Sequence, residues 1–244
     1  MNTSQEDIIN KVNVVYSKYP LGVDNVSQYY DQLASLYGQF YEDTDYLGID
    51  INHSLQKDVQ QIIYTLNKIK VDGLIDVGSG TGYWRKFFKN LKKLLAIDIS
   101  KNMLIQSKNE IVARSLIEKN KYFEMNCNII DLDLENIVGY EAVFIGFILS
   151  HYSNSDIMKI LNNIKKNKNI RYIIIIDSVY GKYRINRKNM ETYKNIVSDE
   201  KKISVYKRYF TKNNWLELLE EIEMSTRINK SYWGETFFIE VIYI

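Results

Sequence analysis

Hydrophobic residues follow two different periods along this chain, and the change between them falls near residue 70. Before it, Asn25–Tyr41 and Leu55–Ile69 carry apolar residues at three- and four-residue spacings, which predicts amphipathic helices. After it, short apolar runs alternate with segments of helical pattern. We therefore expect a helical N-terminal region, residues 1–70, followed by an α/β domain, residues 71–244.

Five parallel strands are expected at the short apolar runs after residue 70, and the fourth and fifth are apolar throughout, as buried parallel strands should be. They are predicted at Leu74–Val77, Leu94–Asp98, Tyr122–Met125, Glu141–Leu149 and Tyr172–Asp177. Helices are predicted between them at Tyr83–Asn90, Lys101–Lys119 and Ser155–Lys165. The alternation lapses in residues 178–210, a polar insertion that ends in a predicted strand, Ile203–Phe210. A helix, Thr211–Glu223, and two closing strands, Met224–Ser231 and Phe237–Ile244, complete the pattern.

Composition narrows the class of protein. The 244 residues are 45% hydrophobic, enough for the core of one large domain. Lys and Arg total 32 against 30 Asp and Glu, so the chain lacks the basic excess of a nucleic-acid-binding domain. The single cysteine, Cys127, excludes an internal disulfide and a cysteine-based zinc cluster. With a polar start and no apolar run of membrane-spanning length, we expect a cytoplasmic protein.

A glycine-rich loop lies between the first two predicted strands. Its glycines, Gly78, Gly80 and Gly82, are spaced G-x-G-x-G, whereas a dinucleotide fingerprint needs G-x-G-x-x-G. Asp76 precedes the loop; a carboxylate there would repel a phosphate but could accept a hydrogen bond from a cationic amino group. The next strand ends in a second carboxylate, Asp98, sixteen residues after the last glycine.

This arrangement resembles motif I of the class I S-adenosylmethionine-dependent methyltransferases, and the resemblance extends from about Tyr29 to the C-terminus. It implies a Rossmann-like α/β fold: a seven-stranded, mostly parallel sheet with a C-terminal antiparallel hairpin and a helical N-terminal lid. It also implies S-adenosyl-L-methionine as the cofactor. In that family the glycine loop packs under the methionine and ribose portions. Asp98 matches the acid that takes both ribose hydroxyls, and Met103 matches the apolar cover of the adenine.

The stretch after the third predicted strand departs from the family. The usual Gly-Asp-Ala is replaced by Asn126-Cys127-Asn128-Ile129, so the acid that faces the adenine amine is missing. Either asparagine could offer an amide oxygen instead, and Ile129 could pack on the ring. The residues that the resemblance assigns to cofactor binding are Tyr30, Tyr37, Asp76, Gly78, Ser79, Gly80, Asp98, Ile99, Met103, Asn126, Cys127, Asn128, Ile129, Gly146 and Phe147.

The end of the fourth predicted strand bears on the methyl acceptor. Residues 146–152 contain no proline, whereas enzymes that methylate the amino groups of nucleic-acid bases typically carry a Pro-Pro-aromatic motif there. The stretch resembles small-molecule methyltransferases, in which a histidine often closes this strand. His151 suits a general base because an imidazole titrates near neutral pH. The alternative is a structural histidine that satisfies loop backbone groups.

Two other segments are candidates for the acceptor site. Residues 29–37 resemble the opening of amino-sugar N-methyltransferases, where the helix forms a lid, and the rings of Tyr30 and Tyr37 would lie near the sulfonium. The insertion leaves the carboxyl edge of the sheet, where ligands bind in open α/β folds. Its Tyr180, Arg184 and Arg208 could line an acceptor pocket or lie in solvent.

We therefore expect in-line methyl transfer to nitrogen or oxygen of a small molecule, such as a sugar or secondary metabolite. No metal, nucleic-acid or membrane partner is expected, and the oligomeric state is left open. One alternative is a Rossmann-type dehydrogenase, which Asp76 and Tyr83 disfavour. The other is a catalytically silent subunit that binds cofactor beside a partner.

Overall fold

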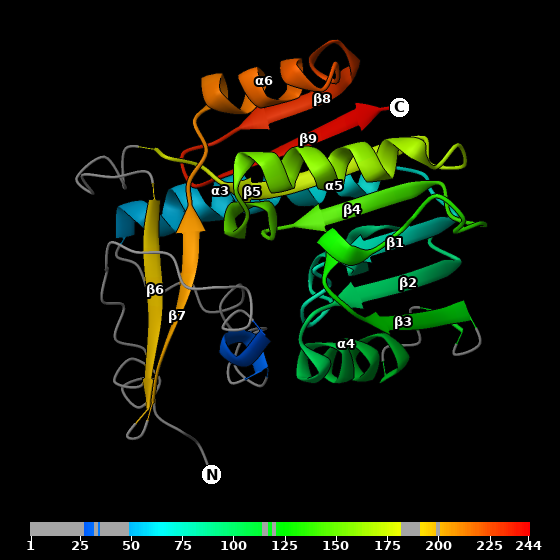
Figure 1. The fold of residues 1–244 in the computed structure, drawn as a ribbon, viewed down its shortest axis with the longest axis horizontal. Coiled ribbons are helices and arrows are strands. Elements are labelled where there is room, and N and C mark those ends of the chain that lie inside the picture. The colour runs from blue at the N-terminus through cyan, green and yellow to red at the C-terminus, as the bar shows by residue number, and fades with distance from the viewer. Residues whose placement is uncertain are drawn as a thin grey trace.

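The computed structural model describes residues 27–31, 34, 49–113, 117–118, 121–181, 191–198 and 201–244. A seven-stranded sheet in the order β3-β2-β1-β4-β5-β9-β8 forms its centre (Figure 1). The parallel strands are β1 (Gly73–Val77), β2 (Lys93–Asp98), β3 (Tyr122–Asn126), β4 (Ala142–Gly146) and β5 (Tyr172–Ser178). Because the strand order reverses between β1 and β4, their carboxyl ends open a crevice of the kind that binds ligands in such sheets.

The last two strands close the sheet as an antiparallel hairpin. β9 (Phe237–Tyr243) pairs antiparallel with β5 on one side and with β8 (Ile228–Trp233) on the other. The predicted seven-stranded, mostly parallel sheet with a C-terminal hairpin is confirmed.

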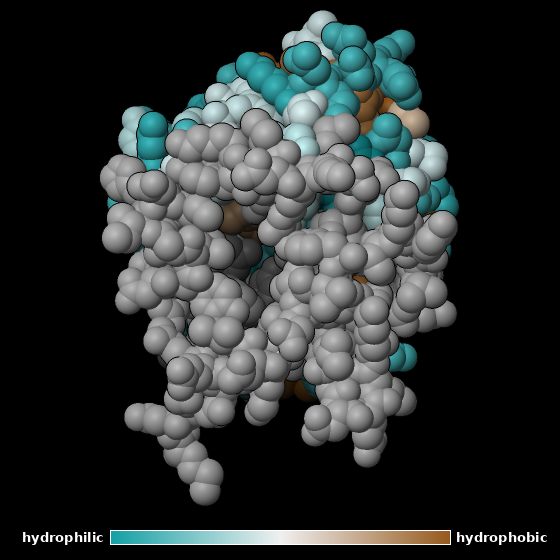
Figure 2. All heavy atoms as spheres, turned by 90° about the vertical axis from the view of Figure 1, so that its left-hand side faces the viewer, coloured by the Kyte–Doolittle hydropathy of each residue, from teal (hydrophilic) through white to brown (hydrophobic). Residues whose placement is uncertain are grey.

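Helices cover both faces of the sheet, because successive side chains along each strand point alternately into two apolar clusters. Ile75 of β1 faces the cluster that includes α5 (Asn154–Lys166) and α6 (Lys212–Glu221). Its neighbour Leu74 faces the cluster that includes α3 (Ile49–Lys68) and α4 (Lys101–Ala113). The outer surface at the α6 end is mainly hydrophilic (Figure 2), as expected of amphipathic helices that bury one side.

Polar side chains cap the N-termini of α4, α5 and α6. The Ser100 hydroxyl accepts a hydrogen bond from the Met103 amide at 3.1 Å at the start of α4. Ser153 caps α5 through Asp156, and Thr211 forms a reciprocal capping box with Asn214 at α6. α4 begins directly after β2, and α5 begins after β4 and η6, so the N-termini of both helices lie at the carboxyl edge of the sheet.

The predicted helix Tyr83–Asn90 is wrong. Only a short 3-10 helix, η3 (Trp84–Phe87), forms there. Trp84, Arg85 and Phe88 are all buried, and the Arg85 guanidinium turns toward Asp76. The Phe88 amide donates to the Arg85 carbonyl at 3.1 Å, three residues back, and Phe88 itself is extended, so the chain leaves the helical path after one 3-10 turn.

The insertion forms a two-stranded antiparallel ribbon, which the sequence predicts only in part. β6 (Glu191–Ser198) pairs with β7 (Lys201–Arg208), and the two strands stand apart from the main sheet (Figure 1). β7 contacts η6 (Leu149–His151), the 3-10 helix that follows β4. The ribbon therefore reaches the carboxyl edge of the sheet through His151 and its neighbours.

The residues that the structure describes include neither a candidate membrane span nor a candidate metal-binding cluster. Within those ranges no helix combines the length and apolar character that a bilayer crossing requires. The same residues contain no group of three or more His, Cys, Asp and Glu side chains placed to hold a metal ion.

Candidate functional site

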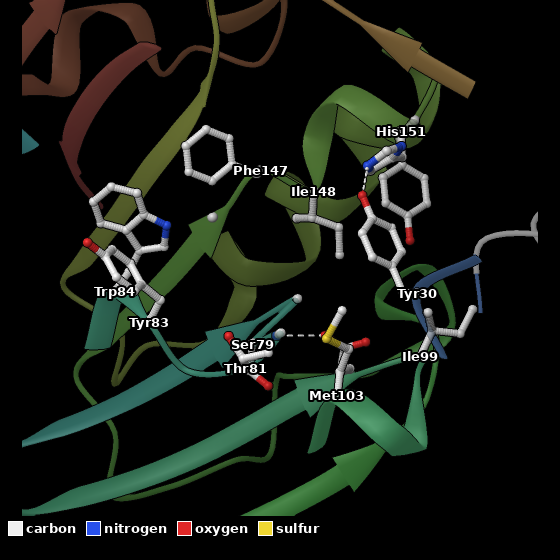
Figure 3. Close-up of a pocket in the computed structure, with 15 residues that line it drawn as sticks. Tyr30, Ser79, Thr81, Tyr83, Trp84, Ile99, Met103, Phe147, Ile148 and His151 are labelled. Atoms are coloured by element: carbon white, nitrogen blue, oxygen red, sulfur yellow. Dashed lines mark hydrogen bonds between the residues drawn. The ribbon is translucent and has the colours of Figure 1, made fainter. Parts of the chain in front are cut away.

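A pocket with about 780 Å³ of empty space, part of it continuous with solvent, lies at the carboxyl ends of β1, β2 and β4 (Figure 3). The residues that line it come from the segment 27–31, the glycine loop and η3, the end of β2, α4, and the end of β4 with η6. They are Tyr30, Gly78, Ser79, Gly80, Thr81, Tyr83, Trp84, Asp98, Ile99, Met103, Gly146, Phe147, Ile148, His151 and Tyr152.

The glycine loop presents bare backbone to this pocket. Gly78, Gly80 and Gly82 have φ values of 66°, 51° and 87°, in the left-handed region that favours glycine. A Cβ on Gly78 would lie 2.7 Å from the Ile148 side chain. A Cβ on Gly80 would meet no atom closer than the Gly78 oxygen at 3.9 Å, so Gly80 leaves space that a ligand can fill.

Asp98 links the end of β2 to the glycine loop. Its Oδ2 accepts a hydrogen bond from the Gly80 amide and its Oδ1 one from the Ser100 amide, each at 2.8 Å. Burial raises the pKa of Asp98 to about 6, against the two amide hydrogen bonds, which lower it. The carboxylate is therefore ionised at neutral pH, and each oxygen keeps a lone pair for a ligand hydroxyl.

Asp76 occupies a different environment from the one that the resemblance implies. It is buried beside Arg85, whose Nε lies 3.2 Å from Asp76 Oδ2, and it is not among the described residues that line the pocket. Arg85 Nη2 also donates to the Ser79 carbonyl at 3.1 Å, which ties the pair to the glycine loop. Burial raises the pKa of Asp76, and the Arg85 charge opposes that shift.

Some buried polar atoms at the loop have no hydrogen-bond partner among the described residues. They include Asp76 Oδ1, Ser79 Oγ and Arg85 Nη1. Ser79 lines the pocket, so its hydroxyl is available to a bound molecule. A buried hydroxyl of this kind is costly unless a ligand or water pairs with it, so Ser79 makes the loop a candidate binding site.

Aromatic rings form another part of the wall. The ring centroids of Phe147 and Trp84 are 5.8 Å apart, and Phe147 also packs edge-on against Phe237 at 4.7 Å. Phe147 has a φ of 61°, an uncommon conformation for a bulky residue, and its amide donates to the Ile176 carbonyl at 2.7 Å. Backbone strain held in this way is typical of functional sites.

His151 has hydrogen-bond partners on two different elements, Tyr206 of β7 and Tyr30, and Figure 3 shows the contact with Tyr30. Its Nδ1 lies 2.5 Å from the Tyr206 carbonyl oxygen of β7, and its Nε2 lies 2.7 Å from the Tyr30 hydroxyl. Because a carbonyl can only accept, Nδ1 must carry the proton in the neutral imidazole. Nε2 is then the acceptor, and the Tyr30 hydroxyl donates to it.

The segment 27–31 is fastened across the edge of the pocket. The Asp31 carboxylate accepts hydrogen bonds from the Ser100 hydroxyl and from the Asn102 amide, the latter at 3.2 Å. The Ser27 hydroxyl donates to the Ile99 carbonyl at 3.2 Å. Asp31 thus sits at the N-terminus of α4, where the helix dipole favours a negative charge.

Residues 126–129, at the end of β3 and just after it, are not in the described lining of the pocket. Asn126 Nδ2 donates to the carbonyls of Asp98 and Ile99, each at 2.9 Å, so the side chain braces the end of β2. Asn128 Oδ1 accepts from the Tyr152 hydroxyl at 2.9 Å. Ile129 is part of the core and Cys127 is half-buried against it.

The remaining candidates divide between described and undescribed residues. Tyr180 and Arg208 are described but do not line the pocket. Arg208 Nη1 donates to Asn154 Oδ1 at 2.5 Å. Tyr37 and Arg184 lie outside the described residues. Sequence reasoning missed five lining residues, and all of them adjoin motifs that it identified: Thr81, Tyr83, Trp84, Ile148 and Tyr152.

Comparisons with known proteins agree on the fold. No protein-family model matches the sequence, and a search of curated proteins finds no match. Among solved structures, the chain is similar to one described as a DhpI-SAM-HEP complex. The TM-score is 0.63 and the identity 13%, over 92% of this chain and 99% of that one.

Two further structures give the same result. One is magnesium protoporphyrin IX methyltransferase (ChlM) from Synechocystis PCC 6803 with bound SAH, with a TM-score of 0.62 and 12% identity over 91% of this chain and 99% of that one. The other is an S-adenosylmethionine-dependent methyltransferase from Clostridium acetobutylicum ATCC 824, with a TM-score of 0.58 and 12% identity over 88% of this chain and 98% of that one. The chain therefore has the Rossmann-like fold of these methyltransferases.

Proposed function

We propose that this protein transfers a methyl group from S-adenosyl-L-methionine to a nitrogen or oxygen of a small molecule, a sugar or a secondary metabolite. One observation carries the proposal: a single pocket brings together the glycine loop, the Asp98 carboxylate and the Tyr30–His151 pair. The first two are groups that suit the cofactor, and the third is a group that suits proton removal from an acceptor.

The residues of the pocket fit the cofactor. Asp98 offers the remaining lone pairs of its two oxygens to the ribose hydroxyls, and Met103 offers an apolar side chain to the adenine. The bare backbone at Gly80 suits the methionine portion, and so does the Ser79 hydroxyl, which has no hydrogen-bond partner among the described residues. When bound, S-adenosyl-L-methionine supplies an electrophilic methyl group on a sulfonium whose departure as a neutral thioether needs no acid.

The chain's own residues then have two tasks. The first is to hold the acceptor in line, and positioning of this kind can lower a barrier by ~7–11 kcal/mol in favourable cases. The second is to remove a proton from the attacking atom. An acceptor bonded to the Tyr30 oxygen can pass its proton there while the Tyr30 proton moves to Nε2 of His151, whose Nδ1–H stays on the Tyr206 carbonyl.

The acceptor class rests on the sequence around His151 and on the fold. Solved structures of this fold include a DhpI complex with SAM and HEP and a magnesium protoporphyrin IX methyltransferase, so the fold accommodates different small molecules. The described lining of the pocket combines aromatic rings with hydroxyl groups, a combination that suits a partly polar metabolite.

Calorimetry tests the cofactor assignment. S-adenosylhomocysteine should bind to the purified chain while NAD does not, and Asp98→Ala should abolish the binding. NAD binding in place of S-adenosylhomocysteine would favour a dehydrogenase instead.

Transfer is tested next with radiolabelled S-adenosyl-L-methionine and a panel of amino sugars and hydroxylated metabolites. His151→Gln should slow single-turnover transfer to the acceptor found in this way; an unchanged rate would remove His151 from the chemistry. Cofactor binding with turnover only in the presence of a co-purifying protein would identify a silent subunit.

A further inference from the structure

A buried ion pair lies behind η6, outside the described pocket lining. Lys207 of β7 and Asp177 of β5 have side chains that are 5% and 0% exposed, and Lys207 Nζ lies 3.4 Å from Asp177 Oδ1. The lysine is on the ribbon and the aspartate is on the main sheet. The pair is thus a buried polar connection between the insertion and the parallel strands.

The ion pair is also connected to the two residues that form the His151–Tyr206 hydrogen bond, through the residue next to each of them in the sequence. Asp177 Oδ2 accepts from the Ser150 amide at 2.9 Å, and Lys207 Nζ donates to the Ser150 hydroxyl. Ser150 directly precedes His151 in η6, and Lys207 directly follows Tyr206 in β7. The imidazole and the carbonyl that binds it are therefore each fixed by an adjacent residue, and both adjacent residues bind to Asp177.

Because the ion pair is buried, it favours one position of the ribbon against the main sheet. An ion pair removed from water gains little net stability, because loss of hydration offsets the attraction between the charges. It does penalise any register of the ribbon that would leave one of its charges unpaired. A buried polar residue fixes the register of two elements in this way in coiled coils.

We propose that Lys207 is a positioning residue: with Asp177 it holds the Tyr206 carbonyl on Nδ1 of His151 and thereby keeps Nε2 unprotonated toward Tyr30. The consequence for the reaction rests on the proposed function, whereas the tautomer of His151 does not. Lys207 acts on the base through the backbone of its neighbour and needs no contact with cofactor or acceptor.

The tautomer can be measured directly by nitrogen NMR. The chain has two histidines, so His53→Gln in a ¹⁵N-histidine-labelled protein leaves only the signals of His151. At alkaline pH, where free imidazole is neutral, we expect Nδ1 to show the shift of a protonated nitrogen and Nε2 that of an unprotonated one. In the Lys207→Met variant both nitrogens should move toward a common average, as the two tautomers mix.

Two further variants keep the result interpretable. Lys207→Met combined with Asp177→Asn removes the connection without leaving an unpaired buried carboxylate, so it should shift the tautomer even if the single variant fails to fold. Lys165→Met is the matched control, because Lys165 Nζ binds the Ile222 carbonyl at 2.9 Å between α5 and the end of α6. It should leave the signals of His151 unchanged.

The outcomes separate this inference from the proposed function. A pure Nδ1–H tautomer in the folded Lys207 variants, or an Nε2–H tautomer in the unmodified chain, overturns the positioning role. Failure to bind S-adenosylhomocysteine overturns the proposed function and leaves the NMR result standing.

Discussion

The hydroxyl of Tyr30 lies 2.7 Å from Nε2 of His151, although the two residues are 121 positions apart in the chain. Their rings also meet edge-on, with centroids 5.6 Å apart. Tyr30 belongs to the segment fastened on α4 and His151 to η6. The pair therefore forms only when the start of the described chain lies against the carboxyl edge of the sheet.

Tyr30→Phe keeps the ring and removes the hydroxyl. The single-turnover rate of methyl transfer should fall by ~100-fold or more, the contribution of a positioned proton-transfer group, while the affinity for S-adenosylhomocysteine stays the same. Quenched-flow measurement with the acceptor tests this. Tyr122→Phe is the control. The Tyr122 hydroxyl lies 2.9 Å from the Ser107 hydroxyl, and neither residue is in the described lining of the pocket. Equal losses in both variants would contradict a role for the Tyr30 hydroxyl.

Asp98→Asn should change how stability depends on pH. Burial raises the pKa of Asp98 to about 6 in the folded state, against an ordinary value of about 4. Between these values the folded state holds a proton that the unfolded state has lost, so rising pH lowers the stability of the native chain. A difference of about two pKa units between the folded and unfolded states corresponds to ~3 kcal/mol of folding stability.

Urea denaturation at several pH values measures this effect. The unmodified, ligand-free chain should lose up to ~3 kcal/mol relative to Asp98→Asn as the pH rises from about 4 to about 7. The amide also leaves one backbone N–H without its acceptor, at a cost that is independent of pH. A constant difference between the two proteins would show that Asp98 titrates normally.

Gly78→Ala and Gly80→Ala distinguish an effect on the stability of the fold from an effect on ligand binding. Both positions have positive φ, so each alanine should cost ~1–2 kcal/mol in backbone strain. Gly78→Ala should cost more, because its Cβ would lie 2.7 Å from Ile148. Gly80→Ala should lose at least tenfold in affinity for S-adenosylhomocysteine, because its Cβ would occupy pocket space. Thermal melts and calorimetry measure the two effects, and native affinity in Gly80→Ala would place the ligand elsewhere.

Lys207→Met should be strongly destabilising. It leaves the Asp177 carboxylate buried with no opposite charge, and losses of ~3–5 kcal/mol are usual when one partner of such a pair is removed. Adding Asp177→Asn removes the unpaired charge and should recover part of that loss. Chemical denaturation of the two variants provides the comparison, and a single variant no less stable than the double one would argue against an ionic contact.

Much of the fold follows from the sequence because the inner parallel strands β1, β2, β4 and β5 are buried on both faces. The unbroken apolar runs at β4 and β5 can hardly form anything else, and the caps at Ser100, Ser153 and Thr211 have simple chemical signatures. The β6–β7 ribbon was predicted only in part, because it stands apart from the sheet and its polar sequence carries no strong alternation.

The candidate site was predictable where its residues are close in sequence. The glycine loop and Asp98 fall within one β-α-β unit, so their spacing alone suggests that they meet. Arg85 was hidden inside a segment that resembled an ordinary helix. The Asp177–Lys207 pair spans 30 positions and joins a strand end to a ribbon, and no local pattern connects two such residues.

The contact between His151 and position 206 uses the main chain of Tyr206 and not its side chain. Every amino acid carries the same carbonyl, so an alanine scan would pass over this position and many residues could replace the tyrosine without loss of the contact. The bond depends instead on where the strand lies, and a shift of the ribbon by one residue would break it without altering a single side chain.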